Sequence, residues 1–186
     1  PGISFKNKDE GLQWLLFGLE EINKRQKTNY RPKYRVLNAA GYGVPQYRER
    51  LFMVASIEGK EFCFPEYTHF ESDELNHQKD GSPFVTSWDA LHDLIIVEKD
   101  SELKMTGKWA DLLPSIPEGK NYLWHTSRGG GKPLFGWRTR YWSFLLKLAK
   151  NQPSWTIQSK PGSSTGPFHW GNRKLSIREL CRIQTL

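Results

Sequence analysis

The pattern of apolar and polar residues predicts an amphipathic helix near the start of the chain. Between Asp9 and about Lys27, apolar residues recur at intervals of three and four, as on one face of a helix. They are Leu12, Leu15, Leu16, Leu19 and Ile22. Residues 34–38 then predict a short strand, and the near-continuous apolar run 51–57 is typical of a strand buried in a parallel sheet. These elements indicate α/β character.

Helix signals return in the second half of the chain. Thr86 and Asp89 have the spacing of a capping box, which predicts a short helix that extends to about Ile95. Residues 140–150 predict another amphipathic helix, and residues 155–159 predict a strand. The predicted inward face of that helix consists of Tyr141, Phe144, Leu145 and Leu148.

The last predicted helix has a complete start signal, with loop-rich sequence before it. Ser176 is the N-cap and Glu179 its capping-box partner, while Leu175 and Leu180 occupy hydrophobic-staple positions. Residues 161–171 and 106–138 predict loops. Within the second loop, the triplet Gly129, Gly130 and Gly131 predicts a flexible surface loop, and a DNA-probing loop is the alternative.

Composition indicates a folded chain with no disulfide scaffold. Hydrophobic residues make up 37% of the sequence, which includes eight Trp and ten Phe. No apolar stretch is long enough to cross a bilayer and no signal-peptide pattern opens the chain, so we expect a cytoplasmic protein with no membrane partner. Cys63 lies between two phenylalanines, so we expect it to be a buried apolar residue. Cys181 lies on a predicted helix, where we expect it to pack in the core. No Cys/His spacing resembles a zinc site.

The net charge of +7 is unevenly distributed. Residues 58–118 carry five Lys/Arg and fourteen Asp/Glu, whereas residues 119–186 carry twelve Lys/Arg and one acid, Glu179. Five tryptophans accompany these basic residues. A solvated basic face is the simplest explanation, but the mixture of basic and aromatic residues favours a nucleic-acid partner.

The segment 41–50 carries the most specific chemistry. It reads Gly-Tyr-Gly-Val-Pro-Gln-Tyr-Arg-Glu-Arg, a turn followed by three polar side chains at alternate positions: Gln46, Arg48 and Arg50. If the chain is extended there, these side chains lie on one face. Guanidinium groups beside a buried strand require polar partners. A surface turn with solvated arginines is the alternative.

Two segments resemble motifs of one protein family. Residues 44–50 resemble the VPQxRxR motif of cytosine-C5 DNA methyltransferases, and residues 173–185 resemble the RxLTxREaaRlQ segment of the same family. The two motifs stand in the family's order with a variable stretch between them, although residues 60–170 match only loosely. His169 and Trp170 stand where the family often has His-Pro.

The resemblance implies a fold and a division into domains. Residues 1–60 would form the end of a doubly wound, AdoMet-dependent methyltransferase domain, and residues 61–186 a small mixed α+β target-recognition domain with the RxLTxRE segment. A linker is expected near residues 60–80. The family's AdoMet loop, Pro-Cys nucleophile and Glu-Asn-Val motif would precede residue 1, with Pro1-Gly2 following the last of these. We therefore expect that the chain is an internal fragment of a methyltransferase, or the part contributed by one of its subunits, and that it is inactive alone. S-adenosyl-L-methionine is expected to be bound mainly by other segments.

The resemblance also implies an activity and roles for single residues. The intact protein would methylate C5 of a flipped-out cytosine in a specific double-stranded DNA sequence, as part of a prokaryotic restriction-modification system near the nucleoid. Arg50 would donate hydrogen bonds to the cytosine O2, and Arg48 and Gln46 would order the site. Arg173 and Arg178 match the family and are both candidate DNA-binding residues. Arg173 would help to hold DNA or the recognition loops, whereas for Arg178 a pair within the fold is the favoured alternative. Further DNA contacts are expected from Arg128, Lys132, Arg138 and Arg140.

Two other classes of function remain open on the sequence. One is a non-catalytic DNA-recognition subunit that reads the sequence for a separate catalytic chain. The other is an RNA methyltransferase of the same family that acts on tRNA, although the long basic region favours DNA.

Overall fold

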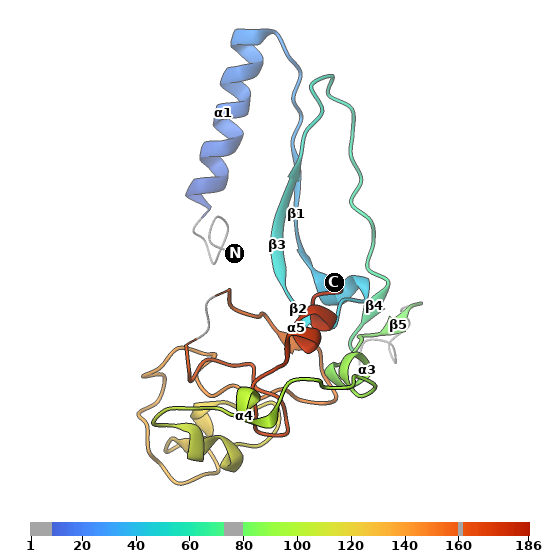
Figure 1. Cartoon of the computed structure of the whole chain (residues 1–186). Coiled ribbons are helices and arrows are strands. Elements are labelled where there is room, and N and C mark those ends of the chain that lie inside the picture. Colours follow the sequence, from blue (N-terminus) through green and yellow to red (C-terminus); the bar gives the residue numbers. More distant parts are fainter. Residues whose placement is uncertain (1–8, 73–79, 160–161) are drawn as a thin grey trace. The chain divides into compact units, whose positions relative to one another are not determined.

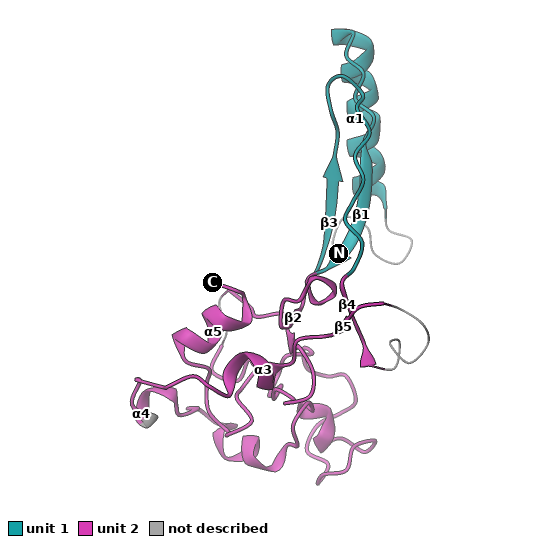
Figure 2. Ribbon diagram, turned by 90° about the vertical axis from the view of Figure 1, so that its right-hand side faces the viewer, with its two compact units in different colours: residues 1–38, 48–67 teal, residues 39–47, 68–186 magenta. Residues whose placement is uncertain are grey.

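The structure, a computed structural model, describes residues 9–72, 80–159 and 162–186 (Figure 1). The chain forms two compact units, coloured teal and magenta in Figure 2. Unit 1 consists of residues 1–38 and 48–67, and unit 2 of residues 39–47 and 68–186. The predicted functional domains, residues 1–60 and 61–186, stay a prediction. Along the described ranges, no helix combines the length and apolar character that crossing a bilayer requires.

Unit 1 contains the predicted first helix, which is confirmed as α1 (Glu10–Gln26). The helix ends at Lys27, which adopts a left-handed conformation with φ of 55°. Asn23 holds the chain that follows, because its Nδ2 donates to the Tyr30 carbonyl (2.9 Å) and its Oδ1 accepts from the Tyr30 N–H (2.7 Å). The predicted apolar face is only partly covered: Leu12 is buried, whereas Leu15 is exposed.

The two strands predicted in this region are β1 (Lys33–Asn38) and β3 (Glu49–Val54). They pair antiparallel, from Lys33 opposite Val54 to Asn38 opposite Glu49. The prediction that the second strand is buried in a parallel sheet is wrong, since Phe52 is 49% exposed. The apolar run of the second strand lies in a sheet of two strands. The described residues of unit 1 leave much of both faces of this sheet uncovered.

Cys63 is also exposed, against the prediction that it is buried. The rings of Phe62 and Phe64 pack edge to face at 5.0 Å. The two phenylalanines on either side of Cys63 thus pack on each other and leave the thiol exposed.

Unit 2 is built from short elements joined by long irregular segments. Its strands form two parallel pairs, β2 (Gln46–Tyr47) with β6 (Ser154–Trp155), and β4 (His69–Phe70) with β5 (Ser82–Pro83). Its helices are η1 (Ala39–Tyr42), α3 (Ser87–Leu91), α4 (Asp100–Leu103), η2 (Ala110–Ser115), η3 (Tyr122–His125) and α5 (Ile177–Ile183). The mixed α/β class is thus observed, while the doubly wound parallel sheet stays a prediction.

Two clusters of buried side chains form the core of unit 2. The first cluster joins η2 and η3 to the segments around residues 144 and 168. Its buried members are Met105, Leu113, Ile116, Tyr122, Phe144, Leu145 and Phe168. The second cluster packs α3 against α5. Its buried members are Ala90, Leu91, Leu148, Leu175 and Ile183.

The predicted helix at residues 140–150 is wrong, because this segment is irregular and lies at the centre of unit 2. Besides two turn-like bonds within the segment, its backbone bonds to two other segments. Leu145 N donates to the Ser164 carbonyl (2.9 Å), and Lys147 N donates to the Lys120 carbonyl (2.9 Å). All residues from 143 to 148 are consequently buried, whereas a helix would bury one stripe.

Lys147 is buried in this central segment. Its Nζ donates to the Ile116 carbonyl and to Asn172 Oδ1, the latter at 2.7 Å. Burial lowers the pKa of Lys147, because the charged ammonium is removed from water. The lysine thereby links three segments of unit 2 that are distant in sequence.

Both predicted capping boxes are confirmed. In α3, Thr86 Oγ1 accepts from Asp89 N (3.1 Å) and the Asp89 carboxylate accepts from Thr86 N (2.9 Å). In α5, the Ser176 hydroxyl accepts from Glu179 N (3.2 Å) and the Glu179 carboxylate accepts from Ser176 N (2.8 Å). The strand predicted at 155–159 is confirmed only in part, since β6 ends at Trp155.

The carboxylate of Glu179 is the centre of a buried ionic cluster. It is 1% exposed and accepts a two-fold hydrogen bond from the Arg173 guanidinium, at 2.7 and 2.8 Å. His169 Nε2 lies 3.6 Å from Glu179 Oε1. The guanidinium and the backbone hydrogen bond of Ser176 hold the pKa of Glu179 below its usual range, although burial opposes this.

Burial and the neighbouring Arg173 charge lower the pKa of His169 to about 4. The hydrogen bonds agree with a neutral ring. Gly171 N donates to His169 Nδ1 (2.9 Å), so this nitrogen carries no proton and the Nε2–H faces Glu179. The cluster thus pairs one guanidinium with one carboxylate beside an uncharged imidazole.

Several predictions of the sequence fall partly on residues outside the described ranges. The linker predicted near 60–80 includes residues 73–79, and the loop predicted at 161–171 includes residue 161. Pro1-Gly2, the residues expected to follow the Glu-Asn-Val motif, also lie outside them.

We predict that His169 makes the protein acid-sensitive. Between the usual histidine pKa of 6.5 and the folded value of about 4, the unfolded chain binds a proton that the folded chain does not. Stability therefore falls as pH falls through this window, by at most about 3 kcal/mol. His169→Asn keeps an acceptor for Gly171 N but cannot titrate, so urea unfolding followed by fluorescence should show a shallower loss between pH 7 and pH 4.5.

His92→Asn provides the control, because His92 is exposed and lies outside the ionic cluster. This variant should keep the wild-type pH dependence. An unchanged slope in His169→Asn would contradict the assignment of the acid sensitivity to His169.

Candidate nucleic-acid interface

The turn predicted before the 44–50 motif is present. η1 leads into Gly43, whose φ of 82° favours glycine. A Cβ atom at Gly43 would also meet the His69 ring at 2.8 Å. The turn is closed by hydrogen bonds from Gly43 N to the Ala40 carbonyl (3.2 Å) and from Thr68 N to the Gly41 carbonyl (2.9 Å). Backbone and side-chain constraints thus act together to shape the start of the motif.

Gln46 and Tyr47 are held in unit 2 by pairing with β6. Ser154 N donates to the Pro45 carbonyl (2.9 Å), and Thr156 Oγ1 donates to the Tyr47 carbonyl (2.7 Å). Gln46 is 1% exposed, and its Nε2 makes no hydrogen bond to any described residue. Burial, followed by the nearby Glu71 charge, raises the pKa of Tyr47.

Arg48 and Arg50 belong to unit 1, where the sheet fixes their backbone. Arg48 N donates to Asn38 Oδ1 (3.1 Å), and Asn38 N donates to the Tyr67 hydroxyl (3.0 Å). Arg50 lies opposite Leu37 in β3, and its Nη1 donates to the Glu49 carbonyl (2.6 Å). Both arginines are half-buried. The predicted shared face of Gln46, Arg48 and Arg50 stays a prediction, because the three belong to different units.

The two arginines of the second motif have different environments. Arg173 is engaged by Glu179, and its Nη1 also donates to the Lys174 carbonyl (2.9 Å). It therefore holds the loop before α5. Arg178 is exposed and forms no hydrogen bond or ion pair with the described residues, so the internal pair favoured by the sequence is not observed.

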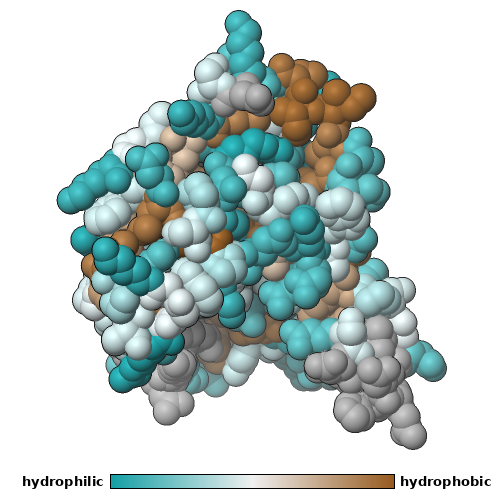
Figure 3. All heavy atoms as spheres, turned by 90° about the horizontal axis from the view of Figure 1, so that it is seen from below, coloured by the Kyte–Doolittle hydropathy of each residue, from teal (hydrophilic) through white to brown (hydrophobic). Residues whose placement is uncertain are grey.

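The remaining predicted DNA contacts are exposed basic residues of unit 2, and the three arginines among them lie over aromatic rings. The guanidinium carbon of Arg128 lies 4.9 Å from the centre of the Trp137 ring, and that of Arg138 lies 5.8 Å from it. Arg140 lies 5.7 Å from the centre of the Phe144 ring. Polar and apolar side chains are interspersed on the face in Figure 3. The contacts between guanidinium groups and aromatic rings orient the guanidinium groups without neutralising them.

The segment that carries Arg128 and Lys132 is positioned by a buried histidine that the sequence did not single out. His125 Nδ1 lies 2.9 Å from the Lys132 carbonyl, and its Nε2 lies 2.8 Å from Ser115 Oγ. The His125 carbonyl accepts from the N–H of Leu134 (2.8 Å) and of Phe135 (3.0 Å). The sequence signal was weak, since a lone histidine in loop-rich sequence has no characteristic spacing.

The prediction of a flexible surface loop at residues 129–131 is only partly consistent with the structure. Gly129 and Gly130 are exposed on one side. On the other side they pack so closely that Cβ atoms there would collide with the Trp124 backbone and ring. The glycines are required for close packing of this loop against the tryptophan.

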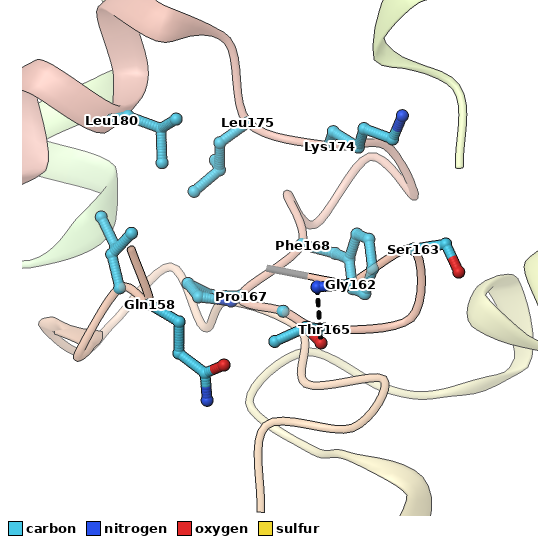
Figure 4. A pocket seen from close by; sticks show the side chains of 11 residues that line it. Gln158, Gly162, Ser163, Thr165, Pro167, Phe168, Lys174, Leu175 and Leu180 are labelled. Carbon is cyan, nitrogen blue, oxygen red and sulfur yellow. Dashed lines mark hydrogen bonds between the residues drawn. The ribbon is translucent and has the colours of Figure 1, made fainter. Parts of the chain in front are cut away.

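A cavity of about 390 Å³ lies beside α5 (Figure 4). Leu175 and Leu180 form one wall, and Pro167 and Phe168 form the opposite wall. Lys174 contributes the charged group, and Gly162 N donates to Thr165 Oγ1 (3.1 Å) within the lining. The lining is thus mainly apolar and carries a basic group.

Known proteins match nearly the whole chain. The family model described as C-5 cytosine-specific DNA methylase matches residues 18–186. The type II methyltransferase M.SacI of Streptomyces achromogenes is 40% identical over 196 residues, covering 99% of this chain and 48% of that protein. The type II methyltransferase M.NgoFVII of Neisseria gonorrhoeae is 30% identical over 188 residues, covering 99% of this chain and 46% of that protein.

The chain thus spans about half the length of the relatives that it matches. The family match includes both sequence motifs, at residues 44–50 and 173–185. We conclude that the chain belongs to the C-5 cytosine-specific DNA methylase family.

Proposed function

We propose that this chain is part of a DNA (cytosine-5-)-methyltransferase of a restriction-modification system. The observation that carries the proposal is the VPQxRxR segment at residues 44–50, within a family match that covers residues 18–186. The type II methyltransferases among its relatives support the assignment. The substrate is a cytosine flipped out of a specific sequence in double-stranded DNA.

Arg50 is proposed to act on the flipped cytosine. Negative charge develops on the pyrimidine carbonyl when a thiolate adds to C6 of the ring, and a guanidinium that donates to O2 stabilises it. Arginine suits this role because it is always charged and presents several donors in one plane. The hydrogen bond to Glu49 occupies Nη1, which leaves the other guanidinium donors for the base.

Arg48 and Gln46 are proposed to order the site rather than to react. The Arg48 backbone is tied to Asn38, and Gln46 is buried with Nε2 available as a donor. Buried amide groups are nearly always hydrogen-bonded, which favours a partner for Gln46 in the complete protein.

Members of this family use S-adenosyl-L-methionine as the methyl donor. The cavity beside Leu175, and a second cavity of unit 2 lined by Lys120, Arg128 and Trp142, do not fit it, since among their described lining residues the charged ones are Lys and Arg. A cationic sulfonium and ribose hydroxyls favour carboxylate neighbours. We therefore assign no residue of this chain to the cofactor. Residues 1–60 are proposed to form the end of the catalytic domain.

Residues 61–186 are proposed to recognise the DNA. Arg128, Lys132, Arg138, Arg140 and Arg178 expose their side chains, and residues 119–186 contain a single acid, Glu179, which is buried. Exposed basic groups of this kind attract phosphates. Arg173 is proposed to support this region from within, through its pair with Glu179.

The direct test of this function is a map of methylated cytosines in DNA exposed to the complete protein and S-adenosyl-L-methionine. We expect 5-methylcytosine at one position of one short recurring sequence. Methylation of tRNA, or of adenine or cytosine N4 instead of C5, would contradict the proposal.

Arg50→Ala should lower the rate of methyl transfer about 10²–10³-fold, the usual loss for one preorganised donor. The affinity for DNA should change little, because the interaction strengthens during the reaction. Arg35→Ala is a matched control, since Arg35 lies in the same sheet and pairs with exposed Glu66. Single-turnover methylation and DNA titration measure the two effects, and normal turnover with weakened binding in Arg50→Ala would assign Arg50 to the phosphate contacts.

If the basic residues of unit 2 contact phosphates, DNA affinity should fall steeply with salt. Each neutralised phosphate adds about 0.9 to the slope of log affinity against log salt concentration. Lys132→Ala, Arg138→Ala and Arg140→Ala should each reduce that slope by about one while the preferred sequence stays the same. Lys24→Ala, in α1 and paired with Glu21, is the control. Equal slopes in all these proteins would refute the proposed phosphate contacts.

A further inference from the structure

Four of the eight tryptophans of the chain meet at one cavity of unit 2, which we name the tryptophan pocket. Its volume is about 390 Å³, within the range typical of small-molecule sites. It is lined chiefly by Lys120, Trp124, Arg128, Trp137, Trp142 and Trp155. Because these residues come from η3, from β6 and from separate loops, no pattern in the sequence indicated the pocket.

The aromatic walls remain accessible although the framework behind them is buried. Trp142 is 53% exposed, and its ring packs edge to face on Trp155 at 5.6 Å. Asn121 is buried and fixes the backbone, because its Nδ2 donates to the Trp142 carbonyl (2.7 Å) and its Oδ1 accepts from Leu123 N (3.0 Å). The close packing of Gly130 on the Trp124 ring fixes another wall. The pocket is thus preformed, with aromatic surface facing solvent.

The charges around the pocket restrict its ligand. Lys120 and Arg128 are in the lining, and Arg138 lies beside Trp137. No carboxylate is found among the described residues that line the pocket, which distinguishes it from aromatic sites that bind cations. The matching ligand has a flat, uncharged ring attached to an anion. A nucleotide within a DNA strand has this chemistry.

We propose that the tryptophan pocket binds one unpaired nucleobase of the DNA substrate. The base stacks on the exposed ring of Trp142, and its phosphate pairs with Arg128 or Lys120. The guanidinium of Arg128, already placed over Trp137, provides a second plane on which bases stack. In an intact duplex both faces of each base are covered by its neighbours, so only an extruded or unpaired base can enter.

This proposal rests on the proposed function, because it assumes that the complete protein binds DNA. It adds that part of the binding free energy comes from stacking on an unpaired base. The affinity should therefore be higher for a duplex that contains one bulged nucleotide beside the methylation site than for the same duplex fully paired. Stacking of one base supplies about a tenfold difference in affinity.

The test measures fluorescence anisotropy of two labelled duplexes, one fully paired and one with a single bulged adenine at successive positions. The complete wild-type protein should bind the best bulged duplex about tenfold more tightly. Trp142→Ala should abolish this preference, whereas Trp142→Phe should retain part of it. Trp88→Ala, an exposed tryptophan on α3 outside the pocket, should behave as wild type.

Arg128→Ala is the second variant, since its side chain is exposed and its removal leaves the packed tryptophans in place. It should weaken binding of the bulged duplex more than that of the paired duplex. Equal wild-type affinity for both duplexes, or an equal effect of Trp142→Ala and Trp88→Ala, would overturn the proposal. If the protein methylates cytosine in paired DNA but shows no such preference, only the pocket proposal fails; if it neither binds nor methylates DNA, the proposed function fails.

Discussion

The buried carboxylate of Glu179 is the interaction on which the organisation of unit 2 depends. It joins the first turn of α5 to the preceding loop, through the Arg173 guanidinium and Ser176 N. The loop in turn binds a more distant segment, because Lys174 N donates to the Leu103 carbonyl (2.7 Å). Removing one partner of such a pair leaves an uncompensated buried charge, which typically costs about 3–5 kcal/mol. The pair thus fixes where α5 packs, and with it the second core cluster.

Unit 2 contains little regular secondary structure, so other anchors replace the hydrogen-bond ladders of helices and sheets. The central segment at residues 143–148 satisfies its backbone through neighbours on both sides. Lys147, His125 and Asn121 add side-chain bonds from buried positions to backbone carbonyls or neighbouring side chains. Irregular segments held in this way can present basic and aromatic side chains in arrangements that one helix face does not allow. This suits a region proposed to recognise DNA.

The proposed functions divide the chain by chemistry. The arginines of the 44–50 motif are half-buried and few, as expected for groups that act on one base. The basic residues of unit 2 that are proposed to contact phosphates are exposed and more numerous, as expected for groups that contact a polyanion. The tryptophan pocket combines both characters, with preformed aromatic walls and charges at its rim. Substitutions in the three groups should therefore affect different quantities: the rate of methyl transfer, the salt dependence of DNA binding, and the preference for unpaired bases.

The sequence by itself determined the features that depend on neighbouring residues. α1, the two capping boxes and the turn at Gly43 were predicted because helical periodicity, cap spacing and positive φ are local properties. The 44–50 motif identified the family for a similar reason, since its residues are contiguous. Tertiary structure decided the rest. Residues 140–150 have a helical apolar pattern, yet they are irregular because backbone bonds to 119–122 and 164–168 are possible only in the folded chain. The meeting of four tryptophans likewise depends on contacts between distant segments, which periodicity cannot encode.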